Sequence, residues 1–187
     1  MTAASRRGAV AMMQDLSQLM VIGPRAGLSP GISDLVSMMN YARFTTLHSV
    51  AGLTTAQLDH VHDAESNSIG ALLLHIAAVE FFYTLKTFRG AASEEELRPW
   101  TAALDLGEAG RSEIRGHNLD YYTDLLESGR NRTQGELAQR DDAWLRTVVP
   151  FGEATANYYF MWFHVFEDEV NHRGQIRWLR KRLPQEM

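Results

Sequence analysis

The most informative absence in this sequence is cysteine, which occurs nowhere among the 187 residues. Without cysteine the chain has no disulfide bonds, no thiolate nucleophile of its own and no zinc or iron–sulfur site built on cysteine ligands. The absence is compatible with a cytoplasmic protein, although it does not by itself fix the compartment. Any metal site in this chain has to be sought among histidines and carboxylates.

A concentrated run of positive charge is also largely missing. The formal net charge is −5, and the basic residues are spread along the chain except for the stretch "RWLRKRL" at residues 177–183. Phosphate binding requires a concentrated basic surface, so a nucleic-acid partner is disfavoured. We interpret the basic stretch as a solvated helix end, where lysine and arginine complement the helix dipole.

Long apolar runs are scarce as well. The N-terminus begins like a signal peptide, with Arg6 and Arg7, but Gln14 and Asp15 interrupt the apolar run that would follow. No stretch reads as a membrane span, so we expect a cytoplasmic protein without a membrane partner. Residues 1–30 are predicted to form an extension outside the core. Residues 31–187 are predicted to form one domain, because the length and the 45% hydrophobic content suit a single core.

What the sequence does contain is helical periodicity, in which apolar residues recur every three or four positions. The predicted helices are residues 33–53 with Ser33 as N-cap and Gly52 as the stop, a segment from Ser66 or Ser68 to Gly90, residues 111–139, and a segment from Thr155 to Leu183. In the third helix the periodicity continues through Gly129 and Gly135, and we favour it over a separate helix starting at Thr133. Four long amphipathic segments predict an all-α fold, a four-helix bundle.

The segments between these helices are predicted to contain little regular structure. Residues 53–68 and 91–110 are polar or acidic connections with at most a turn of helix. Residues 144–157 mix β-branched residues with Pro150 and Gly152, and they are predicted to hold a short extended piece but no sheet.

A cluster of ionisable residues on the predicted helices points to chemistry. Asp168 and His172 are four residues apart, which places them on the same side of a helix and within reach of one ion. The candidate third ligand is His75, in the most apolar part of the second helix. Spacing alone leaves two other interpretations open. A lone histidine in an apolar helix is more often a hydrogen-bonded core residue, and an Asp/His pair at this spacing is more often a surface ion pair.

Two sequence segments resemble the signature pair of the DinB/YfiT-like superfamily. They are "IGALLLHIAAVE" at residues 69–80 and "HVFEDEVNHRGQIRWL" at residues 164–179, and "MMNYARFTTL" at residues 38–47 resembles the start of that family. The resemblance implies a four-helix bundle of the DinB/YfiT-like type with metal ligands at three positions, which are His75, Asp168 and His172. The middle ligand is usually histidine in this superfamily. The carboxylate here is similar to that of the mycothiol-dependent maleylpyruvate isomerases, and Glu169 or Glu167 remain alternatives to Asp168.

Two imidazoles and one carboxylate suit zinc, nickel, iron or manganese as the divalent metal ion. Two nearby residues are candidates for the surrounding pocket. His164 is expected to contribute to cofactor binding or to serve a purely structural role. Gln175, three residues after His172, is expected either to orient that imidazole or to form a hydrogen bond within the bundle.

Three protein ligands leave open coordination positions, as in catalytic metal sites. The resemblance implies an enzyme that transfers a low-molecular-weight thiol of the bacillithiol or mycothiol kind to a small electrophile. It also implies a homodimer that acts on small molecules. The alternatives are a metal-dependent hydrolase, a non-catalytic metal or small-molecule binding protein of the stress response, and a bundle in which the ion only holds the helices together.

Overall fold

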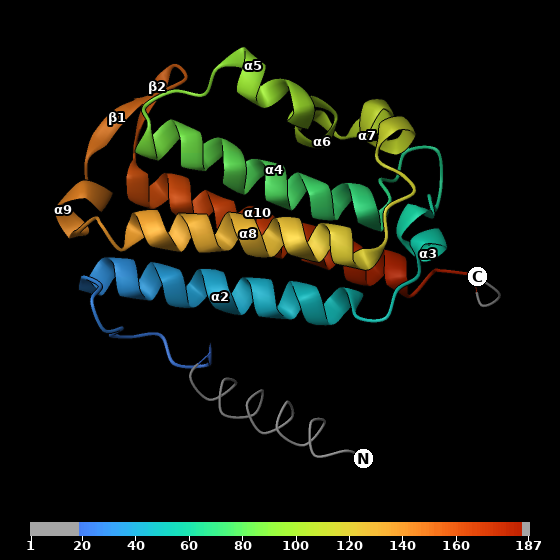
Figure 1. Cartoon of the computed structure of the whole chain (residues 1–187), viewed down its shortest axis with the longest axis horizontal. Coiled ribbons are helices and arrows are strands. Elements are labelled where there is room, and N and C mark those ends of the chain that lie inside the picture. Colours follow the sequence, from blue (N-terminus) through green and yellow to red (C-terminus); the bar gives the residue numbers. More distant parts are fainter. Residues whose placement is uncertain (1–18, 185–187) are drawn as a thin grey trace.

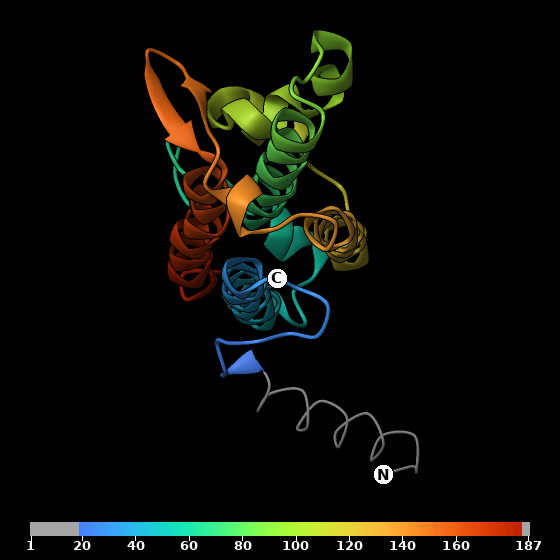
Figure 2. The ribbon, with the colours of Figure 1, turned by 90° about the vertical axis from the view of Figure 1, so that its left-hand side faces the viewer.

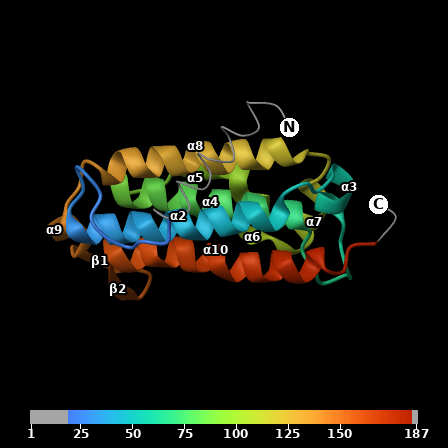
Figure 3. The same ribbon diagram turned by 90° about the horizontal axis from the view of Figure 1, so that it is seen from below.

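The fold is built on four long helices that lie side by side in a computed structural model, which describes residues 19–184 (Figure 1). These helices are α2 (Pro30–Val50), α4 (Ile69–Phe88), α8 (Leu119–Leu137) and α10 (Tyr158–Arg180). Helices α2 and α10 run in one direction, and α4 and α8 run in the opposite direction. Seen end-on, the four helices surround a common core (Figure 2). Helices α2 and α4 lie diagonally opposite each other, and α10 and α8 lie on the two sides between them. From below, α2 lies between α8 and α10 (Figure 3). The protein is therefore predominantly α-helical.

Short elements connect the long helices. They are α3 (Thr55–Asp59), α5 (Glu94–Leu97), the 3-10 helix η1 (Arg98–Trp100), α6 (Thr101–Asp105), α7 (Gly107–Glu113), α9 (Asp142–Leu145), β1 (Val148–Phe151) and β2 (Ala154–Asn157). The elements from α5 to α7 form a layer over the outer side of α4 (Figure 1), and α6 packs against α4. The region predicted as a connection between the second and third helices is therefore mostly helical. A capping box explains its start, since Ser93 and Glu96 each accept a hydrogen bond from the backbone N–H of the other.

Capping residues set the ends of the long helices. The Ser68 hydroxyl accepts a hydrogen bond from the backbone N–H of Ala71, and Gly90 follows α4 with a φ of 86°, which confirms the predicted limits of the second helix. The prediction that Ser33 caps the first helix was wrong. The N-cap is Ser29, because Pro30 provides a φ suited to the first helical position, and Ser33 is buried one turn further on.

The third predicted helix is two helices in the structure. Helix α7 ends at Glu113, Gly116 turns the chain with a φ of 80°, and α8 begins after Asn118, whose side chain caps it. The prediction of one continuous helix through Gly129 and Gly135 is confirmed, because α8 runs without a break to Leu137.

A β-hairpin precedes α10, and the prediction that this region holds no sheet was wrong. Strands β1 and β2 pair in antiparallel fashion, with Val148 opposite Asn157 and Phe151 opposite Ala154. Packing accounts for the error, because Phe151 lies partly buried against the core. Asn157 ends β2 and accepts a hydrogen bond from the backbone N–H of Phe160, so the predicted fourth helix begins at Tyr158 rather than Thr155.

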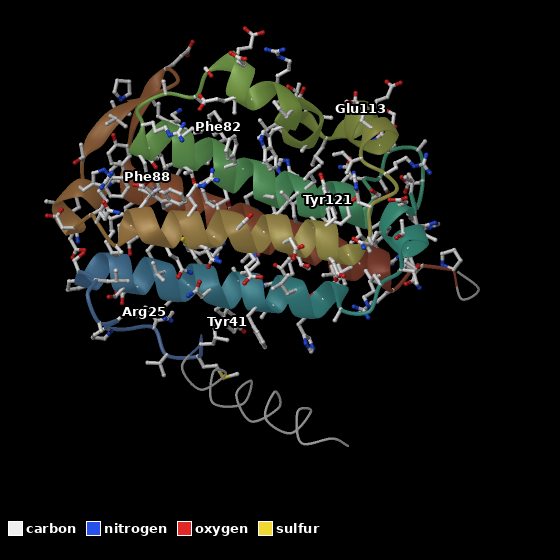
Figure 4. All side chains as sticks on the ribbon, in the orientation of Figure 1. Arg25, Tyr41, Phe82, Phe88, Glu113 and Tyr121 are labelled. Atoms are coloured by element: carbon white, nitrogen blue, oxygen red, sulfur yellow. The ribbon has the colours of Figure 1, made fainter. Side chains whose placement is uncertain are left out.

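The predicted N-terminal extension is described only in part. Residues 1–18 lie outside the described residues. Residues 19–29 run along α2, where Arg25 donates hydrogen bonds from its backbone N–H to Ser33 Oγ (3.1 Å) and from Nε to Ser37 Oγ (2.9 Å). Arg25 and Tyr41 both lie on the outer side of α2 (Figure 4).

Helix α4 corrects one further expectation. Its 20 residues, Ile69–Phe88, are long and apolar enough to cross a membrane, so the prediction that the chain has no such stretch was wrong. Within the fold, 72% of the most apolar window of α4 is buried. The apolar character of α4 is thus explained by its place in the core between α8, α10 and the layer from α5 to α7.

Four charged residues, one from each long helix, meet inside the core. Arg43 of α2 donates from Nη2 to Glu80 of α4 (2.8 Å) and from Nε to Glu169 of α10 (2.9 Å). Arg130 of α8 donates from Nε to Glu80 (2.8 Å) and from Nη2 to Glu169 (3.2 Å). All four side chains are buried. Burying a charge is costly unless it is paired and hydrogen-bonded, and here each guanidinium contacts both carboxylates.

The remaining donors of this ionic core reach backbone carbonyls. Arg43 Nη1 donates to the carbonyl of Leu126 on α8 (2.5 Å), and Arg130 Nη1 donates to the carbonyl of Met39 on α2 (2.6 Å). Burial alone would raise the pKa of Glu80. The charges and hydrogen bonds of Arg130 and Arg43 outweigh that effect and lower the pKa to about 2. The Glu80 carboxylate therefore stays charged at neutral pH. We refer to Arg43, Glu80, Arg130 and Glu169 as the ionic core.

Replacing Arg130 by methionine tests the stabilising role of the ionic core. The Arg130→Met variant leaves two buried carboxylates with one arginine, and we expect its free energy of unfolding to fall by about 3–5 kcal/mol. Urea unfolding measures the change. Arg132→Met, an exposed position on the same helix, is the matched control and is expected to stay within about 0.5 kcal/mol of wild type. Equal losses in both variants would contradict the role of the network.

Acid should destabilise the protein through Glu80. Because the folded-state pKa of Glu80 is lowered to about 2 from 4.5, its contribution is fully present above about pH 4.5 and is lost as the pH falls towards 2. The expected loss attributable to this group is roughly 3 kcal/mol. Urea unfolding between pH 5 and pH 2 measures it. The acid-dependent loss of unfolding free energy should be smaller in Glu80→Gln than in wild type, and the exposed control Glu127→Gln should lose as much as wild type. If the unfolding free energy of all three proteins fell in parallel with pH, the assignment to Glu80 would be ruled out.

Candidate metal centre

Three side chains predicted as metal ligands lie together in the structure. His75 comes from α4, and Asp168 and His172 come from the adjacent helix α10. His75 Nε2 lies 3.5 Å from Asp168 Oδ2, and His172 Nε2 lies 3.3 Å from Asp168 Oδ1. The two imidazole rings are 4.6 Å apart and nearly perpendicular. One donor atom from each residue lies within 4.8 Å of the others. His75 thus shares one small volume with two residues that follow it by 93 and 97 positions in the sequence.

A neighbouring backbone group orients His75. Its Nδ1 lies 2.8 Å from the carbonyl oxygen of Ala103, in α6. A carbonyl oxygen only accepts hydrogen bonds, so Nδ1 carries the proton that it shares with Ala103, and Nε2 is the ring nitrogen that faces Asp168. The layer from α5 to α7 therefore sets the tautomer of one imidazole.

Gln175 orients the second imidazole. Its Oε1 lies 3.3 Å from Nδ1 of His172, which again leaves Nε2 facing Asp168. Burial opposes the charged form of His172. The hydrogen bond and negative charge of Asp168 outweigh burial, with a further contribution from Gln175, and the pKa of His172 is raised. The cluster thus attracts positive charge.

Asp168 is the anionic centre of the cluster. Burial alone would raise its pKa, but hydrogen bonding and the positive potential of His172 and His75 outweigh burial, and the pKa of Asp168 is lowered. Its Oδ2 is buried, and Nε2 of His75, at 3.5 Å, is too distant for a strong hydrogen bond to this oxygen. A buried carboxylate oxygen without a partner is costly, and a cation placed between the two imidazoles would satisfy it.

The spacing of the donor atoms fits a metal ion. Bonds of 2.0–2.1 Å in a tetrahedral zinc site place neighbouring ligand atoms about 3.4 Å apart. The His172–Asp168 separation is 3.3 Å to Oδ1, the His75–Asp168 separation is 3.5 Å to Oδ2, and one donor atom from each residue lies within 4.8 Å of the others. Two imidazoles and one carboxylate form a donor set that suits zinc, nickel, iron or manganese. The residues present therefore fit a divalent cation.

The two alternative carboxylates have other partners. Glu169 belongs to the ionic core, where both of its oxygens bind arginines. Glu167 lies 3.2 Å from Nδ1 of His164 and accepts a hydrogen bond from Asn171 (2.5 Å). Of the three consecutive acids, only Asp168 joins the imidazoles.

His164 does not join the cluster in this structure. Its side chain is 42% exposed, and its ring contacts Phe160 and Tyr83 while its Nδ1 contacts Glu167. The expectation that it binds a cofactor stays a prediction.

Sequence reasoning missed two groups beside the cluster. Tyr83, two turns after His75 on α4, is buried, and its pKa is raised by burial and by the negative charge of Asp168. Its position eight residues after His75 places it on the same side of the helix, and this spacing could have indicated it from the sequence. The role of the Ala103 carbonyl could not be predicted from the sequence, because every residue carries a backbone carbonyl.

Comparisons with known proteins give a family and a fold. The family described as mycothiol-S-transferase matches residues 34–185. A solved structure described as the conserved protein of locus from Enterococcus faecalis is 18% identical, with a TM-score of 0.62 over 79% of this chain and 93% of that chain. At that identity the likeness concerns the fold alone. No curated protein matches the chain.

Proposed function

Because the chain belongs to the mycothiol-S-transferase family, we propose that it is a metal-dependent enzyme that transfers a low-molecular-weight thiol to a small electrophile. The observation that carries the proposal is the convergence of His75, Asp168 and His172 from two helices. The proposal also assigns the four long helices to the four-helix bundle of the DinB/YfiT-like type.

The proposed ligands are Nε2 of His75, Nε2 of His172 and the carboxylate of Asp168. A divalent metal held there supplies Lewis acidity and lowers the pKa of a thiol beside it. Both imidazoles are oriented with Nε2 towards Asp168, because Ala103 and Gln175 contact their Nδ1 atoms. Asp168 contributes the negative charge that offsets a divalent cation.

The sulfur has to come from a second substrate, because the chain contains no cysteine. In the transfer, a bond forms between the thiol sulfur and the electrophilic carbon, the leaving group departs with its bonding electrons, and the thiol proton passes to water. The three proposed ligands come from the protein on two helices, so further coordination positions remain for a substrate.

Exposed apolar surface on α2 and α10 supports a homodimer. Exposed apolar residues lie on the outer faces of α2 and α10, and they are Tyr41, Phe160, Phe163 and Val170. Exposed apolar surface of this kind is typical of protein interfaces. We therefore propose a homodimer. From the family and from the scattered basic residues we also propose a cytoplasmic protein that acts on small molecules and binds no nucleic acid.

Metal analysis tests the proposed ligands. Wild-type protein reconstituted with zinc, nickel, iron or manganese is expected to retain about one ion per chain after dialysis. The His172→Ala variant should retain far less, because two ligands do not hold a divalent ion tightly. His164→Ala, a histidine on the same helix outside the cluster, is the matched control and should retain the ion. Elemental analysis by mass spectrometry gives the content, and equal contents in wild type and His172→Ala would refute the site.

A transfer assay tests the activity. With mycothiol and 1-chloro-2,4-dinitrobenzene, the metal-loaded wild type should form the thioether and release chloride. Asp168→Ala should lower the rate at least 100-fold, because it removes the anionic ligand. Glu167→Gln is the control, since that carboxylate faces His164, and it should keep the wild-type rate. Metal binding without thiol transfer would instead indicate a non-catalytic binding protein, and hydrolysis of an ester panel without thiol would indicate a hydrolase.

A further inference from the structure

A second pocket, of about 380 Å³, lies on a different face of α10 from the candidate metal centre. Its walls come from α2, from α10 and from the segment that leads into α2. Tyr41, on the α2 wall, points away from the core towards that segment (Figure 4). Asp168 and Val170 are two positions apart on α10, so they lie about 200° from each other around the helix. The pocket is therefore separate from the proposed metal ligands.

One end of this pocket is apolar and adaptable. Met38 of α2 and Phe166 of α10 line it, and the segment before α2 contributes Leu19, Met20 and Ile22. Met20 and Ile22 remain largely exposed, so this wall leaves apolar surface uncovered. Flexible methionine side chains fill irregular space and adjust to a ligand. This end suits an aliphatic ligand body.

The other end holds one charge, that of Arg173. It is the only charged residue among the described residues that line the pocket. Its Nη1 donates a hydrogen bond to the hydroxyl of Thr45 on α2, and its Nε is buried with no hydrogen-bond partner among the described residues. A buried N–H without an acceptor is costly. A guanidinium pairs with a carboxylate through two parallel hydrogen bonds, so a carboxylate is the acceptor that suits this group best.

The described part of the chain supplies no carboxylate to Arg173. Asp34 is the only acidic residue of α2 and lies near the opposite end of that helix, and Glu169 is held in the ionic core. Arg177, one turn further along α10, adds a second positive charge and donates from Nε to the hydroxyl of Ser49 (2.8 Å). Two like charges one turn apart, with hydroxyl partners on α2, give this end of the pocket a positive potential.

The apolar and charged ends are in register along the two helices. Helices α2 and α10 run in one direction, and the pocket extends from Met38 and Phe166 to Arg173, which contacts Thr45. Seven positions separate the two ends on each helix, which corresponds to about 10 Å. A ligand with an anionic head and an extended aliphatic body matches this length and this distribution of charge.

We propose that the pocket binds an amphipathic monocarboxylate, whose head pairs with Arg173 and whose aliphatic body lies towards Met38 and Phe166. The proposed homodimer competes for part of this surface, because Tyr41 and Val170 belong to both. A two-fold interface brings the same patch of two copies together. The described lining of this patch contains an arginine and no carboxylate, so a second copy does not supply the acceptor that Arg173 requires.

Octanoate and 1-octanol test the pocket, because they share an aliphatic chain and differ in charge. The metal-free protein is titrated by NMR, so that the carboxylate meets no metal. Octanoate should shift the amide resonances of residues 19–22 and 38–42, and it should bind about tenfold more tightly than octanol. Affinity should also rise about threefold for each methylene from butanoate to octanoate, because each one buries further apolar surface.

Arg173→Gln should bind octanoate about tenfold more weakly than wild type does, because it removes the charge. Its affinity for octanol should stay at the wild-type value, which reports an intact pocket. Arg177→Gln is the matched control, since it removes an arginine that also donates to a hydroxyl of α2 but does not line the pocket, and it should bind both ligands as wild type does.

Four outcomes overturn the proposal. They are the absence of octanoate binding to wild type, equal losses for octanoate and octanol in Arg173→Gln, shifts confined to His75 and His172, and octanoate binding that disappears as the protein dimerises. The last outcome would assign the surface to a second copy. Octanoate binding that appears only in Asp15→Asn would overturn it as well, because the partner of Arg173 would then be the chain's own residues 1–18.

Discussion

The arrangement of the long helices depends on the ionic core of Arg43, Glu80, Arg130 and Glu169. Each helix contributes one charge, and each arginine bridges both carboxylates, so no helix can rotate or slide without breaking a buried ion pair. Apolar packing tolerates small changes of register, whereas a buried charge that loses its partner does not. This network therefore selects one arrangement among the many that four amphipathic helices permit.

The same network positions the candidate metal centre. Successive residues on a helix are about 100° apart, so fixing Glu169 towards Arg43 and Arg130 turns the preceding Asp168 towards α4. On α4, Glu80 points into the ionic core, and His75, five residues earlier, points to the side facing α10. The centre is thus aligned by charges that take no part in it.

Much of this organisation was accessible from the sequence, but only where the signal was local. The limits of α4 followed from Ser68 and Gly90, and the spacing of Asp168 and His172 placed them on one face of a helix. The hairpin and the layer from α5 to α7 were missed because contacts with distant residues, such as Phe151 against the core, stabilise short elements. The choice of Asp168 over Glu169 also required the structure, because it depends on arginines from two other helices. Glu80 in an apolar helix was the one available hint of the ionic core.

The hydrogen bond from His75 to Ala103 ties the centre to a part of the protein that is built differently from the rest. Short helices joined by turns open locally at a lower free-energy cost than long packed helices do. If α6 separated from α4, the imidazole of His75 would lose its hydrogen bond to Ala103 and could rotate away, while the four long helices would remain folded. Under the proposed function, the lifetime of the bound ion would depend on local opening of α6 rather than on global unfolding. The rate of ion exchange would then be set by the stability of the layer from α5 to α7.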